Sequence, residues 1–398
     1  MNKKILVFGE ALTNAHILRP WAIALELAEK GYDIYFATQK FFFKLGLKIP
    51  KTINLIELPT SIESAYFIEE VSSGRFPFTE EVLRKNILED EKLLNKIMPD
   101  LIISDFRLSL AISNRTLKYK QATLTNLYWS PYAKISRPIP RGHIITKILG
   151  GNIGDFLSKF IQPLVLKHLA NPFNKILREK KLPLFKNLLE IHAFGSKVLY
   201  CDPSGFVPHR TLPSHHFEVG PLCHYFSEYC NIRLDRKSNT LPWIFIALGS
   251  SGCHKYIEKI LYSLSFIKNP IIVATSKNIS KKKYSNNITF CNYIPGNIIL
   301  KDSVLFITNG GSTASYLALS HGVPSLGLPV NIDQAMNSML VKKHGVGDFL
   351  YKLKPDALRK KINFLINSKD VKMNCIRIKN QIQHHKSCNS IWNIIKNA

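Results

Sequence analysis

The chain is most informative at residues 307–315, which read Ile-Thr-Asn-Gly-Gly-Ser-Thr-Ala-Ser. An apolar strand ends in two glycines here, and a helix begins with Ser312 and Thr313. Glycines allow a phosphate to approach the backbone, and the free N–H groups at a helix start favour an anion. A glycine turn on its own more often serves only to reverse the chain. The stretch therefore predicts a strand-turn-helix unit that has the capacity to bind phosphate.

Strands and helices alternate along the whole chain around this unit. Short apolar runs are followed by amphipathic helical stretches, a pattern that predicts parallel sheets with helices on both faces. The predicted fold class is therefore α/β. We expect strands in the first half at residues 5–8, 33–37, 53–58, 101–104, 122–127 and 197–201, and in the second half at 243–248, 270–274, 288–293, 304–307 and 325–328.

These two similar halves predict two domains. A chain of 398 residues with 45% apolar content is long enough to build two hydrophobic cores. We assign residues 1–222 to an N-terminal domain, 223–240 to a polar linker and 241–398 to a C-terminal domain. The stretch 143–191 is interpreted as a helical insertion, whose apolar positions are usually core.

The charge balance is unusual, because 54 Lys and Arg residues against 28 Asp and Glu residues give a net charge of +26. Such a charge attracts polyanions. A coding bias toward lysine is one explanation, and contact with an anionic membrane is the next. Nucleic acid is not expected as a partner, because no nucleic-acid-binding pattern is present. The cluster expected to contact a membrane is 39–48, with Phe41, Phe42, Phe43, Lys44 and Lys48.

The cysteines and the apolar runs bear on the compartment. Seven scattered cysteines form no Cys-x-x-Cys pair, so neither a zinc site nor a redox motif is expected and a reducing cytosol fits. The first apolar run is interrupted by Glu10, which leaves it too short for a signal peptide. Residues 303–332 carry no Asp, Glu, Lys or Arg, but glycines and prolines break them. We therefore expect a cytoplasmic protein, with at most peripheral contact at the inner face of a membrane.

Two further motifs follow the glycine turn, His321-Gly322-Val323-Pro324 and Pro329-Val330-Asn331-Ile332-Asp333-Gln334. Gly322 lies thirteen positions after Asn309, and Gln334 lies twelve positions after Gly322. With these spacings the string resembles the donor signature of the UDP-glycosyltransferase superfamily. Its Asn-Gly-Gly-Ser form is similar to a bacterial branch of macrolide and sterol glycosyltransferases. The resemblance implies a metal-independent enzyme with the GT-B fold, in which two Rossmann-like domains face a central cleft.

The resemblance also implies a donor site in the C-terminal half. Asn309 stands where the superfamily has a phosphate-contacting His, and Asp333 and Gln334 match the residues that hold the sugar hydroxyls. The positions that correspond to the diphosphate and base contacts are Gly249, Ser250, Tyr293, Pro295, Gly310, Gly311, Ser312 and Thr313.

Two positions depart from the usual signature of the superfamily. Gly296 stands where a Gln is usual, and Leu317 where a Glu usually grips the ribose. UDP is the first expectation for the donor nucleotide and dTDP the second. The nucleotide sugar is a co-substrate, and neither another cofactor nor a metal is expected.

A candidate base lies near the N-terminus. His16 precedes a predicted helix, where a lone His is more often a cap or packing residue. Asp105 ends the strand 101–104, so both residues lie at the carboxyl edge of one parallel sheet, where α/β folds assemble their sites. His16 lies fifteen positions before Gly31, as the base does in the superfamily. The resemblance therefore implies that His16 is the base and that Asp105 pairs with it.

A neutral imidazole can take the proton of an acceptor hydroxyl while a carboxylate fixes its tautomer. Attack on the face opposite the leaving diphosphate would invert the anomeric centre. We therefore expect an inverting hexosyltransferase that acts on a hydroxyl of a small or lipid-like acceptor. Asp100 competes with Asp105, although it lies at the opposite edge of the sheet, and Glu10 is a further candidate base. The alternatives are a nucleotide-sugar epimerase and a non-catalytic accessory protein of the same fold.

Overall fold

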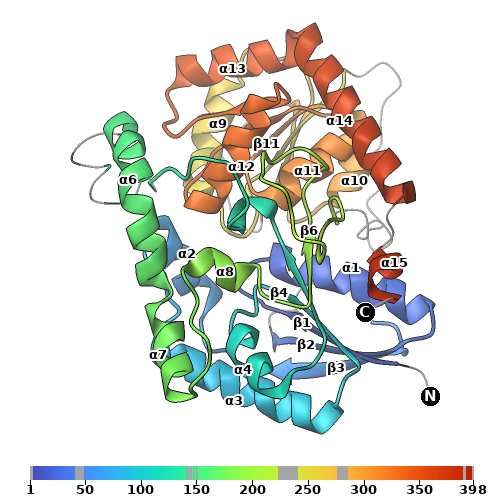
Figure 1. The fold of residues 1–398 in the computed structure, drawn as a ribbon. Helices are drawn as coiled ribbons and strands as arrows, with labels where there is room; N and C mark the ends of the chain where they lie inside the picture. The colour runs from blue at the N-terminus through green and yellow to red at the C-terminus, as the bar shows by residue number, and fades with distance from the viewer. Residues whose placement is uncertain are drawn as a thin grey trace. The chain divides into compact units, whose positions relative to one another are not determined.

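The computed structural model describes residues 3–40, 49–139, 143, 146, 148, 151–222, 241–275, 286–388 and 391–396. The chain divides into two compact units (Figure 1). The first comprises Met1–Ile139, His143–Leu222 and His385–Ala398, and the second is mainly Cys223–His384. The expected linker 223–240 lies outside the described residues, as does 41–48, the larger part of the expected membrane-contact cluster 39–48.

The first unit is built on a seven-stranded parallel sheet of order β3-β2-β1-β4-β5-β6-β7. All six strands expected for this half are present, and the short β7 was not predicted. Because β1 lies between β2 and β4, the strand order changes direction there, which is where α/β sheets usually bind ligands. The strands are β1 (Lys4–Gly9), β2 (Asp33–Gln39), β3 (Ile53–Leu58), β4 (Leu101–Asp105), β5 (Gln121–Thr125), β6 (Lys197–Tyr200) and β7 (His216–Glu218).

Helices cover this sheet and bury their apolar faces against it. A large cluster of buried apolar side chains includes Leu83, Ile112 and Phe173 from three of these helices. The sequence also sets helix ends: Thr79 Oγ1 accepts from Val82 N at 3.3 Å before α3, and Met98 ends α3 in a left-handed conformation. The helices are α1 (Ala15–Glu29), α2 (Ser64–Ser72), α3 (Glu80–Ile97), α4 (Leu110–Leu117), α6 (Gly151–Leu169), α7 (Asn171–Glu179) and α8 (Leu188–His192).

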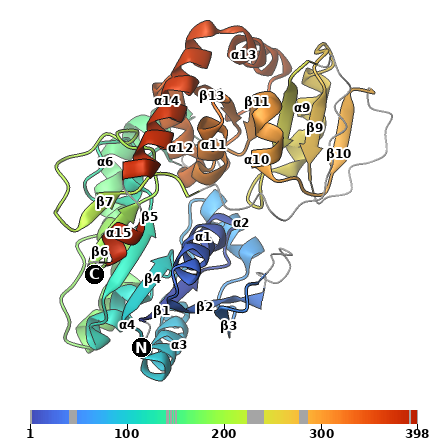
Figure 2. The same ribbon diagram turned by 90° about the vertical axis from the view of Figure 1, so that its right-hand side faces the viewer.

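The C-terminal segment corrects the predicted domain limits. Residues 385–398, assigned from sequence to the C-terminal domain, cluster with the first unit. The last helix, α15 (Ile391–Lys396), lies beside β6 (Figure 2) and buries Ile391 and Ile395. Lys30 Nζ, just after α1, lies 5.1 Å from the centre of the Trp392 ring. The physical reason is the apolar face of this short helix, which is covered by a unit formed from the other end of the chain.

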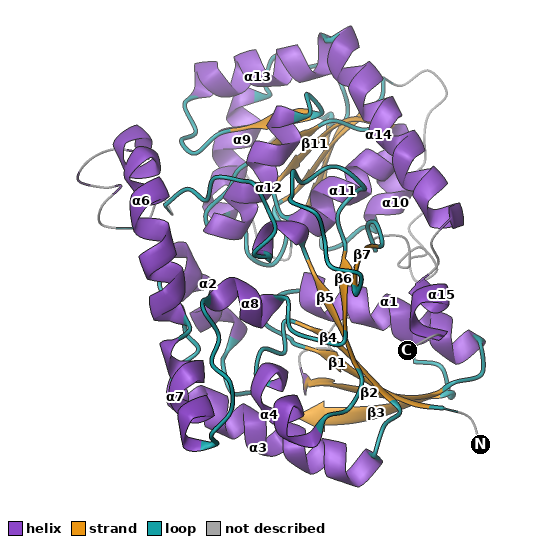
Figure 3. Ribbon diagram, viewed as in Figure 1, coloured by secondary structure: helices purple, strands orange, loops and turns teal. Residues whose placement is uncertain are grey.

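The second unit contains a parallel sheet, drawn in orange behind the helices in Figure 3. It has six strands in the order β10-β9-β8-β11-β12-β13. Its five expected strands are present, and β13 was not predicted. The strands are β8 (Trp243–Ala247), β9 (Ile271–Ala274), β10 (Ile288–Cys291), β11 (Ser303–Thr308), β12 (Ser325–Gly327) and β13 (Gly347–Phe349). The helices are α9 (Ile257–Ser263), α10 (Gly296–Ile299), α11 (Ser312–Ser320), α12 (Ile332–Lys343), α13 (Pro355–Asn367) and α14 (Lys369–Cys388).

Both units therefore confirm the predicted α/β class, each with one parallel sheet. The charge-free stretch 303–332 folds as β11, α11 and β12, with most of its apolar residues buried in the second unit. Among the helices that the structure describes, none is both long and apolar enough to cross a membrane.

Candidate functional site

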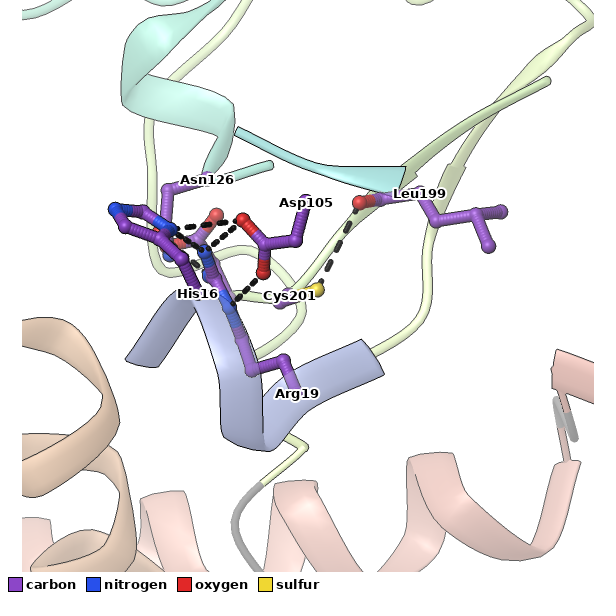
Figure 4. A network of polar contacts seen from close by, with 7 residues as sticks. His16, Arg19, Asp105, Asn126, Leu199 and Cys201 are labelled. Atoms are coloured by element: carbon purple, nitrogen blue, oxygen red, sulfur yellow. Dashed lines mark hydrogen bonds and ion pairs between the residues drawn. The ribbon is translucent and has the colours of Figure 1, made fainter. Parts of the chain in front are cut away.

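The carboxyl ends of β1 and β4 bring His16 and Asp105 together. Gly9 pairs with Asp105 across the two strands, and α1 begins six residues after Gly9. His16 Nδ1 lies 2.9 Å from Asp105 Oδ1 (Figure 4). The side chain of Asp105 is 1% exposed and that of His16 is 18% exposed. The imidazole therefore has one nitrogen fixed by a buried carboxylate, although His16 lies in the first turn of α1 rather than in a loop.

Arg19 completes this pair, and sequence reasoning missed it. Arg19 Nε donates to Asp105 Oδ2 at 2.7 Å, and Nη2 donates to Oδ1 at 2.9 Å. Such a two-point contact fixes the plane of the carboxylate. The available signal was the spacing, because residues three apart on a helix share a face, and His16 and Arg19 have this spacing in α1.

The polar contacts continue from Arg19 to two more strand ends. Arg19 Nη1 donates to Asn126 Oδ1 at 2.8 Å, and Asn126 Nδ2 donates to Asp202 Oδ1 at 2.8 Å. Asp202 Oδ2 in turn accepts from the backbone N–H of Leu127. Because Asn126 follows β5 and Asp202 follows β6, the network ties the ends of β4, β5 and β6 to the first turn of α1.

The charges in this network are compatible with an ionised Asp105. Burial alone raises the pKa of Asp105, but the charges of Arg19 and His16 and their hydrogen bonds outweigh burial and lower the pKa below its usual value. For Arg19 the effect of burial has the opposite sign, because burial on its own would lower the pKa of the guanidinium. The attraction of Asp105 more than offsets burial, so the pKa of Arg19 is raised. Arg19 and Asp105 are therefore both charged at neutral pH.

A series of stacked and tilted rings begins at the imidazole of His16. The ring of Phe106 stacks on it, with centroids 4.4 Å apart and planes 18° apart. Phe106 has a φ of 60°, which is uncommon for a bulky residue. His192 lies 5.4 Å from Phe106 and stacks on Trp129 at 5.0 Å. Burial lowers the pKa of His192 to about 3, so His192 is neutral and adds an uncharged ring to this aromatic environment.

The two competing acids are engaged elsewhere. Glu10 is buried, and its carboxylate accepts from Arg107 Nη1 at 2.8 Å and from Gln39 Nε2 at 2.5 Å. Asp100 accepts from the backbone N–H of Lys4 at 2.8 Å, at the amino end of β1. Among the hydrogen bonds of the described residues, neither carboxylate contacts His16, which leaves Asp105 as its acidic partner.

In the second unit, the predicted donor residues gather at the carboxyl ends of β8 and β11. Gly310 has a φ of 84° and Gly249 a φ of 66°, so both turns use backbone conformations that favour glycine. Asn309 Oδ1 accepts from Gly311 N at 3.1 Å, and Asn309 Nδ2 donates to Ser251 Oγ at 3.1 Å. Asn309 therefore holds the turn before α11 to the loop after β8.

The side chain of Gln334, which is expected to hold sugar hydroxyls, makes hydrogen bonds to two loops of the second unit. Its Nε2 donates to Ser251 Oγ at 3.0 Å, and its Oε1 accepts from Val330 N at 2.8 Å. The side chain is buried and shapes the same loop as Asn309. Asp333, in the first turn of α12, is only partly buried.

The remaining donor positions lie in the loop after β8 and around the starts of α10 and α11. Thr313 Oγ1 is buried without a hydrogen-bond partner among the described residues. Ser312 is buried, Ser250 is exposed, and Pro295 is buried at the start of α10. Tyr293 is 61% exposed.

Gly296 and Leu317, the two residues that depart from the usual signature, are in contact with each other. A Cβ at position 296 would lie 2.7 Å from Leu317 Cδ2, closer than real Cβ contacts allow. Leu317 therefore occupies space that is free only because residue 296 is glycine.

Comparisons with known proteins identify relatives of this chain. Residues 258–395 match the family model of the C-terminal domain of erythromycin biosynthesis protein CIII-like proteins. A PGL/p-HBAD biosynthesis glycosyltransferase of Mycobacterium tuberculosis is 31% identical over 349 residues, which cover 87% of this chain and 81% of that protein. The chain belongs to the UDP-glycosyltransferase superfamily. A PGL/p-HBAD biosynthesis rhamnosyltransferase of Mycobacterium bovis is also 31% identical, over 87% of this chain and 77% of that protein.

Solved structures of glycosyltransferases share the fold. The glycotransferase of kitacinnamycin superposes with a TM-score of 0.70 at 14% identity, covering 97% of this chain and 96% of that one. SsfS6 of Streptomyces sp. SF2575, complexed with thymidine diphosphate, gives a TM-score of 0.63 at 13% identity and covers all of both chains. The fold is GT-B and the protein is a glycosyltransferase, as the resemblance implied.

Proposed function

We propose that this glycosyltransferase moves a hexose from a nucleoside diphosphate sugar to an acceptor hydroxyl with inversion, and that His16 is its general base. The observation that carries the proposal is the contact of His16 Nδ1 with Asp105 at 2.9 Å. Asp105 is ionised, so it accepts the proton of Nδ1 and leaves Nε2 with a free lone pair. A base in this tautomer can receive the proton of a hydroxyl.

In the proposed reaction, the acceptor oxygen forms a bond to the anomeric carbon while the bond from that carbon to the diphosphate oxygen breaks. The hydroxyl proton passes to Nε2 of His16, and the electron pair of the broken bond leaves with the diphosphate. The resulting imidazolium is stabilised by Asp105, whose orientation Arg19 fixes. Proton transfer by a positioned base contributes roughly 10²- to 10⁴-fold to the rate.

We assign the diphosphate to the first turn of α11. Three features support this assignment: the glycine turn at Gly310 and Gly311, the helix start at Ser312, and the Thr313 hydroxyl that has no partner in the described part of the chain. Unpaired N–H groups and the helix dipole stabilise an anion at such a position. The same groups would stabilise the charge that develops on the leaving group, in a mechanism without a metal.

For the nucleotide we place dTDP ahead of UDP, which reverses the order expected from sequence. The contact between Gly296 and Leu317 supports this choice. Leucine offers no hydrogen bond to a ribose hydroxyl. A donor with a 2′-deoxyribose therefore loses no hydrogen bond at this position relative to a donor with a ribose. Rhamnose is the first sugar to test, because one relative is named a rhamnosyltransferase.

For the acceptor we propose a hydrophobic alcohol or phenol. The rings of Phe106, Trp129 and His192 near His16 support an apolar or aromatic group next to the reacting hydroxyl. Aromatic side chains contact such groups through large apolar surfaces and stacking.

The test is product formation with purified protein, using dTDP-rhamnose and UDP-glucose with a panel of phenols and aliphatic alcohols. We expect release of the nucleoside diphosphate that depends on acceptor, and a product whose anomeric configuration is inverted in its NMR couplings. Retention of configuration would overturn the base mechanism. Nucleotide binding without turnover of any donor would favour the non-catalytic alternative.

A further inference from the structure

Helix α6 carries a row of large apolar side chains that face solvent. The exposed fractions are 60% for Phe156, 67% for Phe160, 36% for Ile161, 69% for Leu164 and 45% for Val165. Phe156, Phe160 and Leu164 are spaced by four residues, so they lie on one face of the helix. The sequence favoured core positions for this region, and the structure assigns only part of α6 to the core.

The opposite side of α6 provides that core contact. Leu166 packs into the buried cluster that also contains Phe173 of α7 and Leu188 of α8. The helix is thus anchored to the first unit through one side, while the other side remains apolar and uncovered. An exposed apolar patch of this kind commonly marks an interaction surface.

The exposed rings also cluster with each other. Phe156 and Phe160 meet edge to face, with centroids 5.6 Å apart. We refer to Phe156, Phe160, Ile161, Leu164 and Val165 as the α6 apolar face. Isolated exposed apolar residues are common, but five neighbours on one helix are not explained by chance exposure.

Exposed basic residues lie on α6 itself and on the next helix of the chain, α7. Lys167 is exposed three residues after Leu164, and Arg178 and Lys181 are exposed in and just after α7. Among the ion pairs of the described residues, none joins these three cations to a carboxylate, whereas Lys175 is paired with Glu80 and Lys180 with Glu91. The cations accord in sign with the net charge of +26 and complement an anionic surface.

We propose that the α6 apolar face is a docking surface for an anionic membrane. An interfacial helix combines an apolar face, which enters the boundary between headgroups and acyl chains, with basic residues that face the headgroups. Phe156, Phe160 and Leu164 supply the first property, and Lys167, Arg178 and Lys181 the second. No described helix could span the bilayer, so the contact is peripheral. This proposal is independent of the catalytic one.

Flotation of the full chain with phosphatidylcholine vesicles, with and without phosphatidylglycerol, tests the proposal. The test variant replaces Phe156, Phe160 and Leu164 by Ser. The matched control replaces Leu88, Phe364 and Met373 by Ser, because these residues are 65%, 56% and 67% exposed on other helices. We expect the control to float like the wild type and the α6 variant to lose at least about tenfold in the ratio of bound to free protein, since each buried apolar side chain contributes to interfacial binding.

A second variant tests the charge independently of the apolar face. Changing Lys167, Arg178 and Lys181 to Gln should weaken binding to the anionic vesicles by about fivefold per charge, and added salt should reduce the difference. Circular dichroism and nucleotide affinity check that each variant is folded. Absence of binding to either vesicle, or equal loss in the control variant, would overturn the proposal. So would a wild-type dimer that the α6 variant converts to a monomer without any change in flotation.

Discussion

Arg19 and Asp105 form a two-point ion pair that is buried beside His16, with donor-acceptor distances of 2.7 and 2.9 Å. The carboxylate therefore contacts a permanent cation and an imidazole at the same time. The ion pair fixes the plane of the carboxylate, and the carboxylate in turn orients the ring of His16.

Replacement of His16 by Ala should lower kcat by at least ~10²-fold and leave donor affinity unchanged, because only proton transfer is lost. Turnover and calorimetric donor binding should be measured on the same preparation. His168→Ala serves as the control, since His168 is an exposed histidine on α6. Unchanged turnover in His16→Ala would remove His16 from the mechanism.

From the ion pair between Arg19 and Asp105 we expect different effects on turnover and stability for two substitutions of Arg19. Arg19→Lys keeps the charge but not the fork that contacts both carboxylate oxygens, so kcat should fall by on the order of tenfold or more through misplacement of the base. Arg19→Met should in addition cost about 3–5 kcal/mol in the free energy of unfolding, because it leaves a buried carboxylate without its cation. In folded Arg19→Met, the acid limb of the kcat/KM profile should move to higher pH, because the charge of Arg19 holds the pKa of Asp105 down against the effect of burial. An unchanged pH profile in both variants would limit Arg19 to a structural role.

Because His192 is buried in its neutral form, we expect the free energy of unfolding to fall in acid. Its pKa is about 3 in the folded protein because burial disfavours the charged form, against 6.5 for an exposed histidine. Between these values only the unfolded chain binds the proton, so this contribution is complete above pH 6.5 and is lost as pH falls toward 3, at about 1.4 kcal/mol per pH unit. His192→Phe should remove this slope in urea unfolding. The idea fails if wild type and variant show the same dependence on pH across that range.

The glycine turn before α11 predicts separate effects on binding and on folding. Gly311→Val should weaken nucleotide binding while the fold survives, because among the described residues the only atom near an added Cβ is Asn309 Oδ1 at 3.3 Å. Gly310→Ala should destabilise the unit instead, since its φ is 84° and its Cβ would collide with Ser338 Oγ. Thr313→Ala should reduce affinity less than Gly311→Val. Full affinity in a folded Gly311→Val variant would place the diphosphate elsewhere.

Because Gly296 and Leu317 are in contact, we expect substitutions at the two positions to have coupled effects on the free energy of unfolding. Gly296→Ala should destabilise the protein by about 1–3 kcal/mol, because Leu317 has to move from the added methyl group. In a Leu317→Ala background the same change should cost less, giving a coupling energy of about 0.5–3 kcal/mol in a double-mutant cycle. Additive effects within error would show that the two departures from the signature are independent.

Local patterns in the sequence determined the fold class and indicated which residues form the two candidate sites. Alternation of apolar runs and amphipathic helices predicts parallel sheets, and the sheet edge at which a residue lies follows from its place at the end of a strand. The pairing of His16 with Asp105 is therefore predictable from the sequence, although 89 residues separate them. The glycine turn before α11 is recognisable for a similar reason, because its chemistry is contained in a few consecutive residues.

Only the tertiary structure decided which side chains meet across the chain. Arg19 reaches Asp105, Asn126 contacts Asp202, and Gln334 holds Ser251, through contacts between residues at least 76 positions apart. Such contacts depend on how whole helices and strands pack, and this packing cannot be read from the spacing of apolar residues within one segment. The same holds for burial: periodicity shows that α15 and α6 have apolar faces, but whether a face is covered depends on what the rest of the fold places against it. In the folded protein the apolar face of α15 is buried, whereas the apolar face of α6 is exposed.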